Sequence, residues 1–254
     1  MGETRIEYIL QKLESEGQVR VSKLSAELGC SEVTIRNDIQ KLENKGLLKR
    51  IHGGAVKEDS SISLSMIPGN ITKNPEAKKR IAHQAFLYIN NEDTIILDDS
   101  SVNYYLAKEI ENHPEKSLIV ITNSLIVSVI LSACSHVTLF MLGGQIGGKL
   151  PAAMGELAVS MLSNFKASKA FISAHGVNFD VGITSIGTPQ LQVKKAILDV
   201  ADQIYLLVDS SKFGGGYVMV AAPLARIERI ITDNGISPEN RQLAEEKEVP
   251  LDIV

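Results

Sequence analysis

The chain has 254 residues, of which 44% are hydrophobic and 22% are charged, and its formal net charge is −4. This composition is typical of a soluble protein with room for one large and one small domain. No stretch approaches the roughly 20 apolar residues of a membrane span, and the N-terminus lacks the apolar core of a signal peptide. We therefore expect a cytoplasmic protein with no membrane partner.

Two cysteines, Cys30 and Cys134, lie far apart in the chain without a CxxC motif or a nearby histidine. This spacing does not match a disulfide framework or a zinc site. We expect both to be packing residues, and we expect neither a metal nor a cofactor.

The first elements are helical. Apolar residues at helical spacing predict a helix from Arg5 to Glu16, ended by Gly17. A short strand is expected at 18–21, and a second helix over 23–28 is expected to begin at Ser22 as its N-cap.

A third helix is predicted from Ser31, whose hydroxyl can accept a hydrogen bond from the backbone NH of Thr34. Its apolar residues are expected to form the buried face: Val33, Ile35, Ile39 and Leu42. Its polar residues carry donors that phosphates and base edges accept from. The candidate DNA-binding residues of this helix are Ser31, Thr34, Arg36, Asn37 and Lys41.

Gly46 is expected to end this helix, and strands at 47–51 and 55–57 are predicted to flank a glycine turn at 52–54. From Arg36 to Lys57 there are six Lys and Arg residues against two acids, so this stretch is net positive in an acidic chain. The pattern favours a winged helix-turn-helix, although a solvated small domain would carry similar charges. The wing adds to the candidate DNA-binding residues Lys49, Arg50, His52, Gly53 and Gly54.

The run SEVTIRNDIQKLENKGLLKRIHGGAV, residues 31–56, is similar to the N-terminal signature of the DeoR family of bacterial transcriptional regulators. The resemblance implies that residues 1–57 form a winged helix-turn-helix that binds double-stranded operator DNA. Residues 58–73 are predicted to be a linker, because serines cluster there and Pro68-Gly69 interrupts the periodicity. Its many apolar residues predict that part of it lies against a neighbour.

The third region, 74–254, is predicted to be an α/β domain with a mostly parallel sheet covered by helices on both faces. Asn74, Pro75 and Glu76 are expected to start a helix that runs to about Ile89. Short apolar strands then alternate with helices. The predicted strands are 94–97, 118–122, 138–142, 170–173, 203–208 and 229–232, and the predicted helices are 102–112, 125–133 and 191–201.

Polar residues and glycines follow these strands, and ligands of such sheets bind beyond the carboxyl ends of the strands. Hydroxyls and free NH groups suit a phosphate, whereas carboxylates and amides suit sugar hydroxyls. Each residue taken singly could instead be only a helix cap. The candidate effector-binding residues are Asp98, Ser100, Ser101, Thr122, Asn123, Ser124, Gly143, Gly144, His175, Gly176, Asp209 and Lys212.

The same stretches resemble the DeoR family through TNS at 122–124, LGG at 142–144, DSSKFG at 209–214 and ITD at 231–233. The C-terminal half of that family resembles ribose-5-phosphate isomerase and binds a phosphorylated sugar or related metabolite as its effector. The resemblance therefore implies an effector-binding and oligomerisation domain. At 98–102 the family usually has Asp-Ser-Gly-Thr/Ser-Thr, whereas this chain has an extra carboxylate, Asp99, and lacks the glycine. We expect the effector to differ from the family's commoner ligands or to bind less strongly.

These observations predict a transcriptional repressor of a carbohydrate-utilisation operon, controlled by a phosphorylated sugar. Operators mirror the symmetry of the proteins that bind them, so a homo-oligomer, a dimer or a tetramer, is expected. The alternative is a sugar-phosphate isomerase with a DNA-binding appendage, in which Asp98, Asp209 and Lys212 would supply base and cation. Asn178 stands where the resembling enzymes would offer an acid, and it cannot remove a proton. We therefore expect no enzymatic activity.

Overall fold

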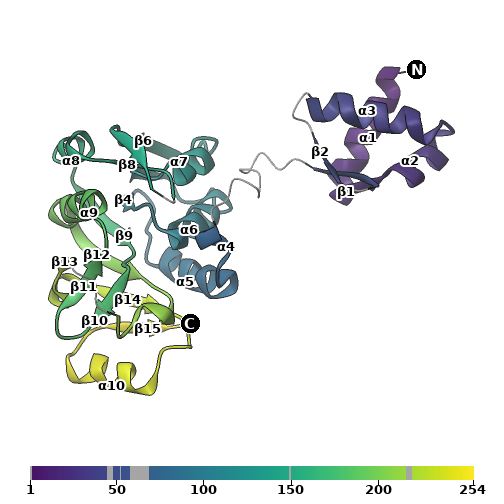
Figure 1. Cartoon of the computed structure of the whole chain (residues 1–254). Helices are drawn as coiled ribbons and strands as arrows, with labels where there is room; N and C mark the ends of the chain where they lie inside the picture. Colours follow the sequence, from purple (N-terminus) through teal and green to yellow (C-terminus); the bar gives the residue numbers. More distant parts are fainter. Residues whose placement is uncertain (1, 45–47, 52, 58–68, 149, 216–218) are drawn as a thin grey trace. The chain divides into compact units, whose positions relative to one another are not determined.

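The computed structural model describes residues 2–44, 48–51, 53–57, 69–148, 150–215 and 219–254. The described residues fall into two compact units, one within residues 1–66 and one within residues 67–254 (Figure 1). Each unit is considered by itself below. None of the helices in these described ranges is long and apolar enough to span a bilayer.

The smaller unit consists of three helices and a three-stranded antiparallel sheet in the order β1-β3-β2. Its apolar core includes Ile9, Leu13, Leu24 and Leu48, all at most 2% exposed. Three helices and a wing were predicted from the sequence, and this architecture is confirmed. The elements are α1 (Gly2–Glu16), β1 (Gln18–Arg20), α2 (Val21–Leu28), α3 (Glu32–Asn44), β2 (Leu48–Ile51) and β3 (Gly54–Lys57).

Helix α2 begins at Val21, two residues earlier than the sequence suggests. Its N-cap is Arg20, with no hydrogen bond from a capping side chain, so the assignment of Ser22 as the cap was wrong. The Val21 amide donates to the carbonyl of Gly53 at 2.9 Å, and the Val21 side chain is buried. The helix start is therefore fixed by the wing backbone and by core packing. The predicted stop at Gly46 lies outside the described residues.

The larger unit contains a seven-stranded parallel sheet in the order β15-β14-β12-β9-β4-β5-β6. Its strands are β4 (Thr94–Leu97), β5 (Leu118–Thr122), β6 (Val137–Met141), β9 (Ala167–Ile172), β12 (Ala201–Leu207), β14 (Arg229–Thr232) and β15 (Leu251–Ile253). The six strands predicted from the sequence are all present, in parallel pairs. The predicted fold class is confirmed.

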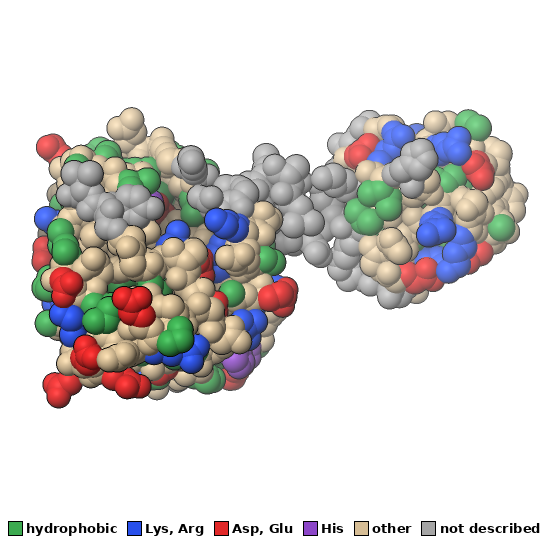
Figure 2. Space-filling model, turned by 60° about the horizontal axis from the view of Figure 1, so that its bottom comes forward, with side chains coloured by type: hydrophobic (Ala, Val, Ile, Leu, Met, Phe, Trp, Pro, Cys, Tyr) green, Lys and Arg blue, Asp and Glu red, His purple; other side chains and the backbone are tan. Residues whose placement is uncertain are grey.

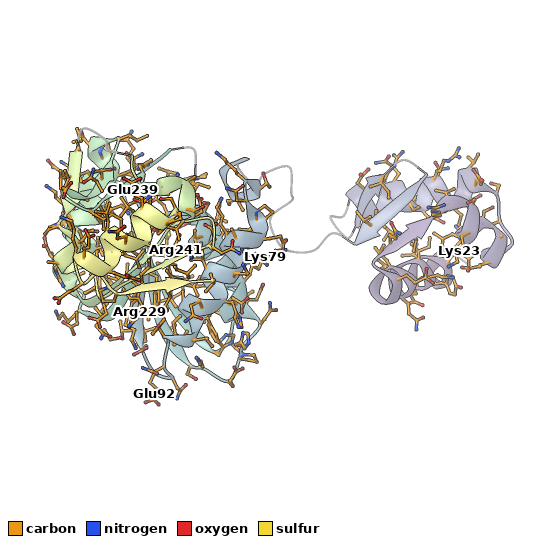
Figure 3. The ribbon with its side chains drawn as sticks, turned by 90° about the horizontal axis from the view of Figure 1, so that it is seen from below. Lys23, Lys79, Glu92, Arg229, Glu239 and Arg241 are labelled. Atoms are coloured by element: carbon orange, nitrogen blue, oxygen red, sulfur yellow. The ribbon has the colours of Figure 1, made fainter. Side chains whose placement is uncertain are left out.

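Helices cover both faces of this sheet (Figure 1). Along β12, Ile204 and Leu206 join one core with α8, α9 and α10. Tyr205 points to the other face, where its ring centroid lies 5.0 Å from that of Tyr88 at the end of α5. Figure 3 shows Glu239 and Arg241 on α10 and Lys79 on α5. The helices are α4 (Gly69–Thr72), α5 (Pro75–Leu87), α6 (Ser101–Glu111), α7 (Leu125–Leu131), α8 (Glu156–Leu162), α9 (Thr188–Val200) and α10 (Pro238–Glu246).

Several short elements were not predicted. They form the hairpin β7 (Gln145–Gly147) and β8 (Ala152–Met154), and a second sheet of β10 (Gly176–Asn178), β11 (Gly182–Ser185) and β13 (Met219–Ala222). Two single-turn helices are η2 (Ser210–Lys212) and η3 (Leu224–Arg226). These elements have at most four residues each, which is too short for a hydrophobic period to be recognised.

The start of the larger unit is anchored by backbone contacts. Ile71 in α4 is 1% exposed, and its carbonyl accepts a hydrogen bond from the Tyr105 hydroxyl at 3.0 Å. Asn74 occupies the N-cap position of α5 in a left-handed conformation, with φ of 52°, and makes no side-chain cap. This sharp turn places Lys73 and the first turn of α5 beside the end of the sheet.

Candidate functional site

The start of α3 has the predicted cap. The Thr34 amide donates to Ser31 Oγ at 3.2 Å, and the two hydroxyl oxygens lie 2.9 Å apart. This pair fixes the first turn of the helix and leaves Ser31 exposed. Hydroxyl groups at the exposed N-terminus of such a helix are well placed for a phosphate oxygen.

Helix α3 buries one face and exposes the other. Ile35, Ile39 and Leu42 are at most 1% exposed, which confirms the predicted buried face for these three. Val33 is 63% exposed, so its assignment to the buried face was wrong. The reason is helical geometry: Val33 lies three and four positions before the exposed residues Arg36 and Asn37, and so shares their face.

The acids in this stretch are held by neighbouring groups. Asp38 is buried and pairs with Arg5 at 2.5 Å, and Glu43 accepts from the Arg50 amide at 3.0 Å. Glu32 pairs with Arg36 at 2.7 Å on the exposed surface, where the ion pair is weak. Lys and Arg side chains gather on the surface of the smaller unit (Figure 2). Val33, Arg36, Asn37 and Lys41 therefore form an exposed face with donors and one apolar side chain, the chemistry that reads a major groove.

The wing depends on its two glycines for different reasons. Gly53 has φ of 80°, which L residues rarely adopt. At Gly54 a Cβ would lie 2.0 Å from the carbonyl oxygen of Val19, so only glycine allows β3 to pair with β1. Arg50 on β2 is exposed, and Lys49 pairs with Val56 in the ladder. His52 and the side chain of Lys49 lie outside the described residues.

The larger unit has a cavity of about 580 Å³ beyond the carboxyl ends of β4, β9 and β12. This is the edge at which a parallel sheet binds ligands. Among the described residues, its lining holds four lysines, three aspartates and one histidine. They are Lys73, Lys78, Lys194, Lys212, Asp98, Asp99, Asp209 and His175.

Asp98 is held by several donors. Its carboxylate accepts from Lys194 Nζ at 2.6 Å, from the Ser173 amide at 2.9 Å and from the Ser100 amide at 3.0 Å. Both members of the ion pair are buried. Asp98 therefore fixes the loop after β4 and neutralises Lys194.

Asp99 differs from Asp98. Burial raises the pKa of the Asp99 carboxyl, the neighbouring Asp98 raises it further, and Lys194 and a hydrogen bond from Asn123 oppose the shift. The carboxylate form of Asp99 is thus poorly compensated, which favours groups that donate hydrogen bonds to it.

A second charged group lies at the β12 end. Lys78 is only 4% exposed, and its Nζ donates to the carbonyl of Lys73 at 2.6 Å. Burial lowers the pKa of Lys78, Asp209 opposes this, and Lys212 and Lys73 add to it. Asp209 accepts from the Ser211 amide at 3.0 Å. In this part of the cavity lining Lys73, Lys78 and Lys212 outnumber Asp209, and an excess of positive charge suits an anion.

His175 lies between these two ends, after β9. Burial lowers the pKa of its imidazole, and Lys194 and Lys212 lower it further, whereas Asp98 raises it. The ring is therefore biased toward its neutral form, in which one nitrogen donates and the other accepts.

Half of the effector residues expected from the sequence line this cavity: Asp98, Ser100, Ser101, His175, Asp209 and Lys212. The cavity lining does not include Thr122, Asn123, Ser124, Gly143, Gly144 or Gly176. Thr122 Oγ1 donates to the Leu97 carbonyl at 2.7 Å, and Ser124 Oγ accepts from the Val127 amide at 3.3 Å as the cap of α7. These two side chains form hydrogen bonds with nearby backbone groups, in line with the alternative that such residues are only helix caps.

The sequence reasoning missed Lys73, Lys78, Gln190 and Lys194. They do not follow a strand: Lys73 lies between α4 and α5, Lys78 is in the first turn of α5, and the other two are in α9. Lysines are rarely buried, so a lysine on the apolar face of a helix is an unusual sequence feature. A search for this feature would have identified Lys78 and Lys194, since both are buried in helices. Within the described residues, no cluster of three His, Cys, Asp or Glu side chains suits a metal ion.

A winged helix-turn-helix with an exposed cationic face, joined in one chain to an α/β unit with a polar cavity, defines the class of two-unit DNA-binding regulators. Family models agree: residues 5–61 match the DeoR-like helix-turn-helix domain, and residues 73–234 match the DeoR C-terminal sensor domain. The chain belongs to the DeoR family of transcriptional regulators.

The relatives match along nearly the whole chain. The uncharacterised HTH-type transcriptional regulator YulB of Bacillus subtilis is 34% identical over 98% of this chain and 96% of its own. The lactose phosphotransferase system repressor of Staphylococcus epidermidis is 32% identical over 91% of each chain. Among solved structures, ribose 5-phosphate isomerase A of Methanocaldococcus jannaschii is similar with a TM-score of 0.42 and 19% identity, over 56% of this chain and 55% of that one.

Proposed function

We propose that this regulator binds operator DNA with α3 and the wing, and that a phosphorylated sugar in the cavity changes its affinity for that DNA. Val33, Arg36, Asn37 and Lys41 contact base edges and phosphates from α3, helped by Ser31 and Thr34 at its start. Lys49, Arg50, His52, Gly53 and Gly54 of the wing contact the backbone of the duplex. One observation carries the proposal: one chain combines a cationic groove-reading helix with a lysine-rich cavity.

The cavity supports an anionic, hydroxylated ligand. Lys73, Lys78 and Lys212 suit a phosphate, and Asp99 and His175 suit hydroxyl groups. Lys73 directly follows α4, the first described element after residue 57, so ligand contact at Lys73 acts on the chain that leads to the DNA-binding unit. A differential affinity of a few kcal/mol between the two arrangements is enough to switch operator binding.

We further propose that the protein is a repressor of a carbohydrate-utilisation operon, acts in the cytoplasm and works as a homodimer or homotetramer. A relative named as a repressor of a lactose phosphotransferase system supports the first point. We place the protein in the cytoplasm because its proposed partner is operator DNA. We propose a homo-oligomer because operators mirror the symmetry of the proteins that bind them. Light scattering of the full chain with and without a palindromic operator tests the oligomeric state, and a monomer bound to one half-site would contradict it.

The cavity does not favour an isomerase. Asp98 is already saturated by Lys194 and two amides, so it is poorly placed to remove a proton. The amide oxygen of Asn178 accepts from the Asp180 and Val181 amides, and Asn178 is absent from the cavity lining. We therefore propose a regulator without enzymatic activity.

The test is DNA binding by fluorescence anisotropy, using fragments of the promoter beside the gene and a panel of sugar phosphates. Wild type should bind in low salt, and at least one sugar phosphate should change its Kd. Lys212→Met should keep the DNA affinity and lose the response. Lys79→Met is the matched control, since Lys79 is an exposed α5 lysine paired with Glu76 (Figure 3). No DNA binding by wild type, or an intact response in Lys212→Met, would overturn the proposal.

A further inference from the structure

The larger unit contains a long stretch that is almost free of charged residues. Between residues 117 and 165, Lys149 and Glu156 are the only Asp, Glu, Lys or Arg residues, whereas the chain's share of 22% would give about 11 in 49 residues. The stretch forms β5, β6, α7, β7, β8 and α8. It reaches the surface, because six of its large apolar side chains are exposed: Ile119, Val129, Phe140, Ile146, Leu157 and Met161. An apolar surface without charge is typical of a contact between proteins.

Strand β6 lies at one edge of the parallel sheet. In the described part of the chain it pairs only with β5, so no strand covers its outer side. Four of its five residues are apolar, none of the five is fully buried, and Phe140 is 42% exposed. An apolar edge strand without charge or proline is a template for pairing with another chain.

The opposite edge of the same sheet is protected against such pairing. Strand β15 has three residues, and Asp252 is the central one. The Asp252 carboxylate pairs with Arg229 at 2.7 Å and accepts from the Tyr88 hydroxyl at 2.6 Å. A short edge strand with a charge directed into the protein is a common protection of sheet edges. The larger unit thus protects the β15 edge and leaves the β6 edge able to pair.

Apolar side chains of α8 continue the exposed surface beside β6. The Phe140 ring centroid lies 5.2 Å from that of Phe165, which follows α8. The Gly143 amide, just beyond the end of β6, lies 3.1 Å from Met161 Sδ. Leu157, one turn before Met161 on the same face of α8, is 71% exposed. Figure 1 shows β6 and α8 at one end of the larger unit. We refer to β6 together with Leu157 and Met161 as the β6 surface.

We infer that the β6 surface is the contact between two copies of this chain, and that the two β6 strands pair antiparallel about a twofold axis. The two seven-stranded sheets then form one continuous sheet. The inference rests on the homo-oligomer of the proposed function and names its interface.

A second copy suits this surface better than another kind of partner. A twofold contact brings a patch against the same patch of the other copy, so a charge in it would meet a like charge. A surface without charge avoids this repulsion, whereas a contact with DNA would need lysines and arginines. A standard interface takes about 800 Å² from each partner, which is about 6% of the 12808 Å² surface of the chain. Residues 117–165 are about a quarter of the larger unit and can supply this area.

The experiment is sedimentation velocity of the full chain without DNA, over a wide range of protein concentrations. Wild type should self-associate. Thr138→Lys on β6 and Leu157→Lys on α8 each place a charge at an exposed position of the β6 surface. Each should raise the Kd of self-association at least about tenfold, because the two copies then bring like charges together.

Val220→Lys and Leu87→Lys are the matched controls, since these apolar residues of β13 and α5 are 42% and 59% exposed outside the β6 surface. Both should self-associate as wild type does, and circular dichroism verifies that every variant is folded. An equal mixture of Thr138→Lys and Thr138→Glu should associate more tightly than either variant alone, because opposite charges then meet across the twofold axis. A variant that is only misfolded would not recover in the mixture.

Three results would overturn the inference: self-association of the β6-surface variants as tight as that of wild type, equal weakening by the control variants, or no recovery in the mixture. The homo-oligomer itself is tested by the wild type. A wild type that stays monomeric at every concentration, with and without operator DNA, rejects the homo-oligomer of the proposed function. A wild-type oligomer that the β6-surface variants leave intact rejects only the β6 surface as its interface.

Discussion

Replacing Lys194 by methionine tests the most deeply buried ion pair of the cavity. The Lys194 and Asp98 side chains are 8% and 3% exposed and lie 2.6 Å apart. Breaking such a pair by removing one partner costs about 3–5 kcal/mol, because a charge is left uncompensated. Asp98 keeps its donors from the Ser100 and Ser173 amides, so the lower part of this range is expected. For a domain of this size, about 3 kcal/mol lowers Tm by roughly 6–12 °C.

The assay is differential scanning calorimetry of the full chain near neutral pH, supported by urea unfolding. Lys166→Met is the matched control, since Lys166 pairs with Asp202 on the surface at 2.6 Å, with side chains 67% and 62% exposed. It should cost less than about 1 kcal/mol. Adding Asp98→Asn to Lys194→Met should recover part of the loss, since both charges are then gone. A decrease in stability no larger than that of the control would refute the reasoning.

Three further outcomes are expected. Arg36→Ala should weaken operator binding by about 1–3 kcal/mol or reduce its salt dependence. The control Lys23→Ala, at an exposed residue of α2, should change neither (Figure 3). If anisotropy titrations give equal operator affinity for the two variants, another face of the unit contacts the DNA. Gly54→Ala should unfold the wing, because its Cβ would lie 2.0 Å from the β1 backbone. Gly53→Ala should lower the free energy of unfolding by only about 1 kcal/mol, since Gly53 has a positive φ. A smaller effect for Gly54→Ala than for Gly53→Ala in thermal unfolding would contradict this. Because the pKa of His175 is lowered in the folded protein, the unfolded chain binds a proton at this residue more readily. The free energy of unfolding should therefore fall as the pH drops below about 6.5. Urea unfolding at several pH values should show a smaller fall for His175→Gln.

Most of the longer elements were predictable from the sequence, although the helices α8 and α10 were not predicted. Strands such as 94–97 and 118–122 are apolar runs flanked by polar turns, and both were placed correctly. Prediction failed where packing decided the outcome. Helix α2 begins at Val21 because the wing backbone bonds its amide, a contact between residues far apart in the chain that no local pattern records.

The cavity was only half predictable, because a polar side chain after a strand has two possible partners. Thr122 and Ser124 satisfy nearby backbone groups, whereas Asp209 and Lys212 face the cavity, and the sequence pattern of the four is alike. Buried lysines are a more decisive signal, because an ammonium group cannot cap a helix start and is buried only where an anion or a carbonyl receives it. Lys78 and Lys194 satisfy this condition through the Lys73 carbonyl and Asp98.

The same reasoning separates the two aspartates after β4. The Asp98 carboxylate already accepts from the Lys194 ammonium and from two backbone amides, so its contacts fix the conformation of the loop after β4. Burial raises the pKa of the Asp99 carboxyl, the neighbouring Asp98 raises it further, and the hydrogen bond from Asn123 only partly opposes this shift. Adjacent residues with the same side chain thus lie in different electrostatic surroundings, because an ammonium group and backbone amides stabilise the charge of Asp98 whereas burial disfavours that of Asp99.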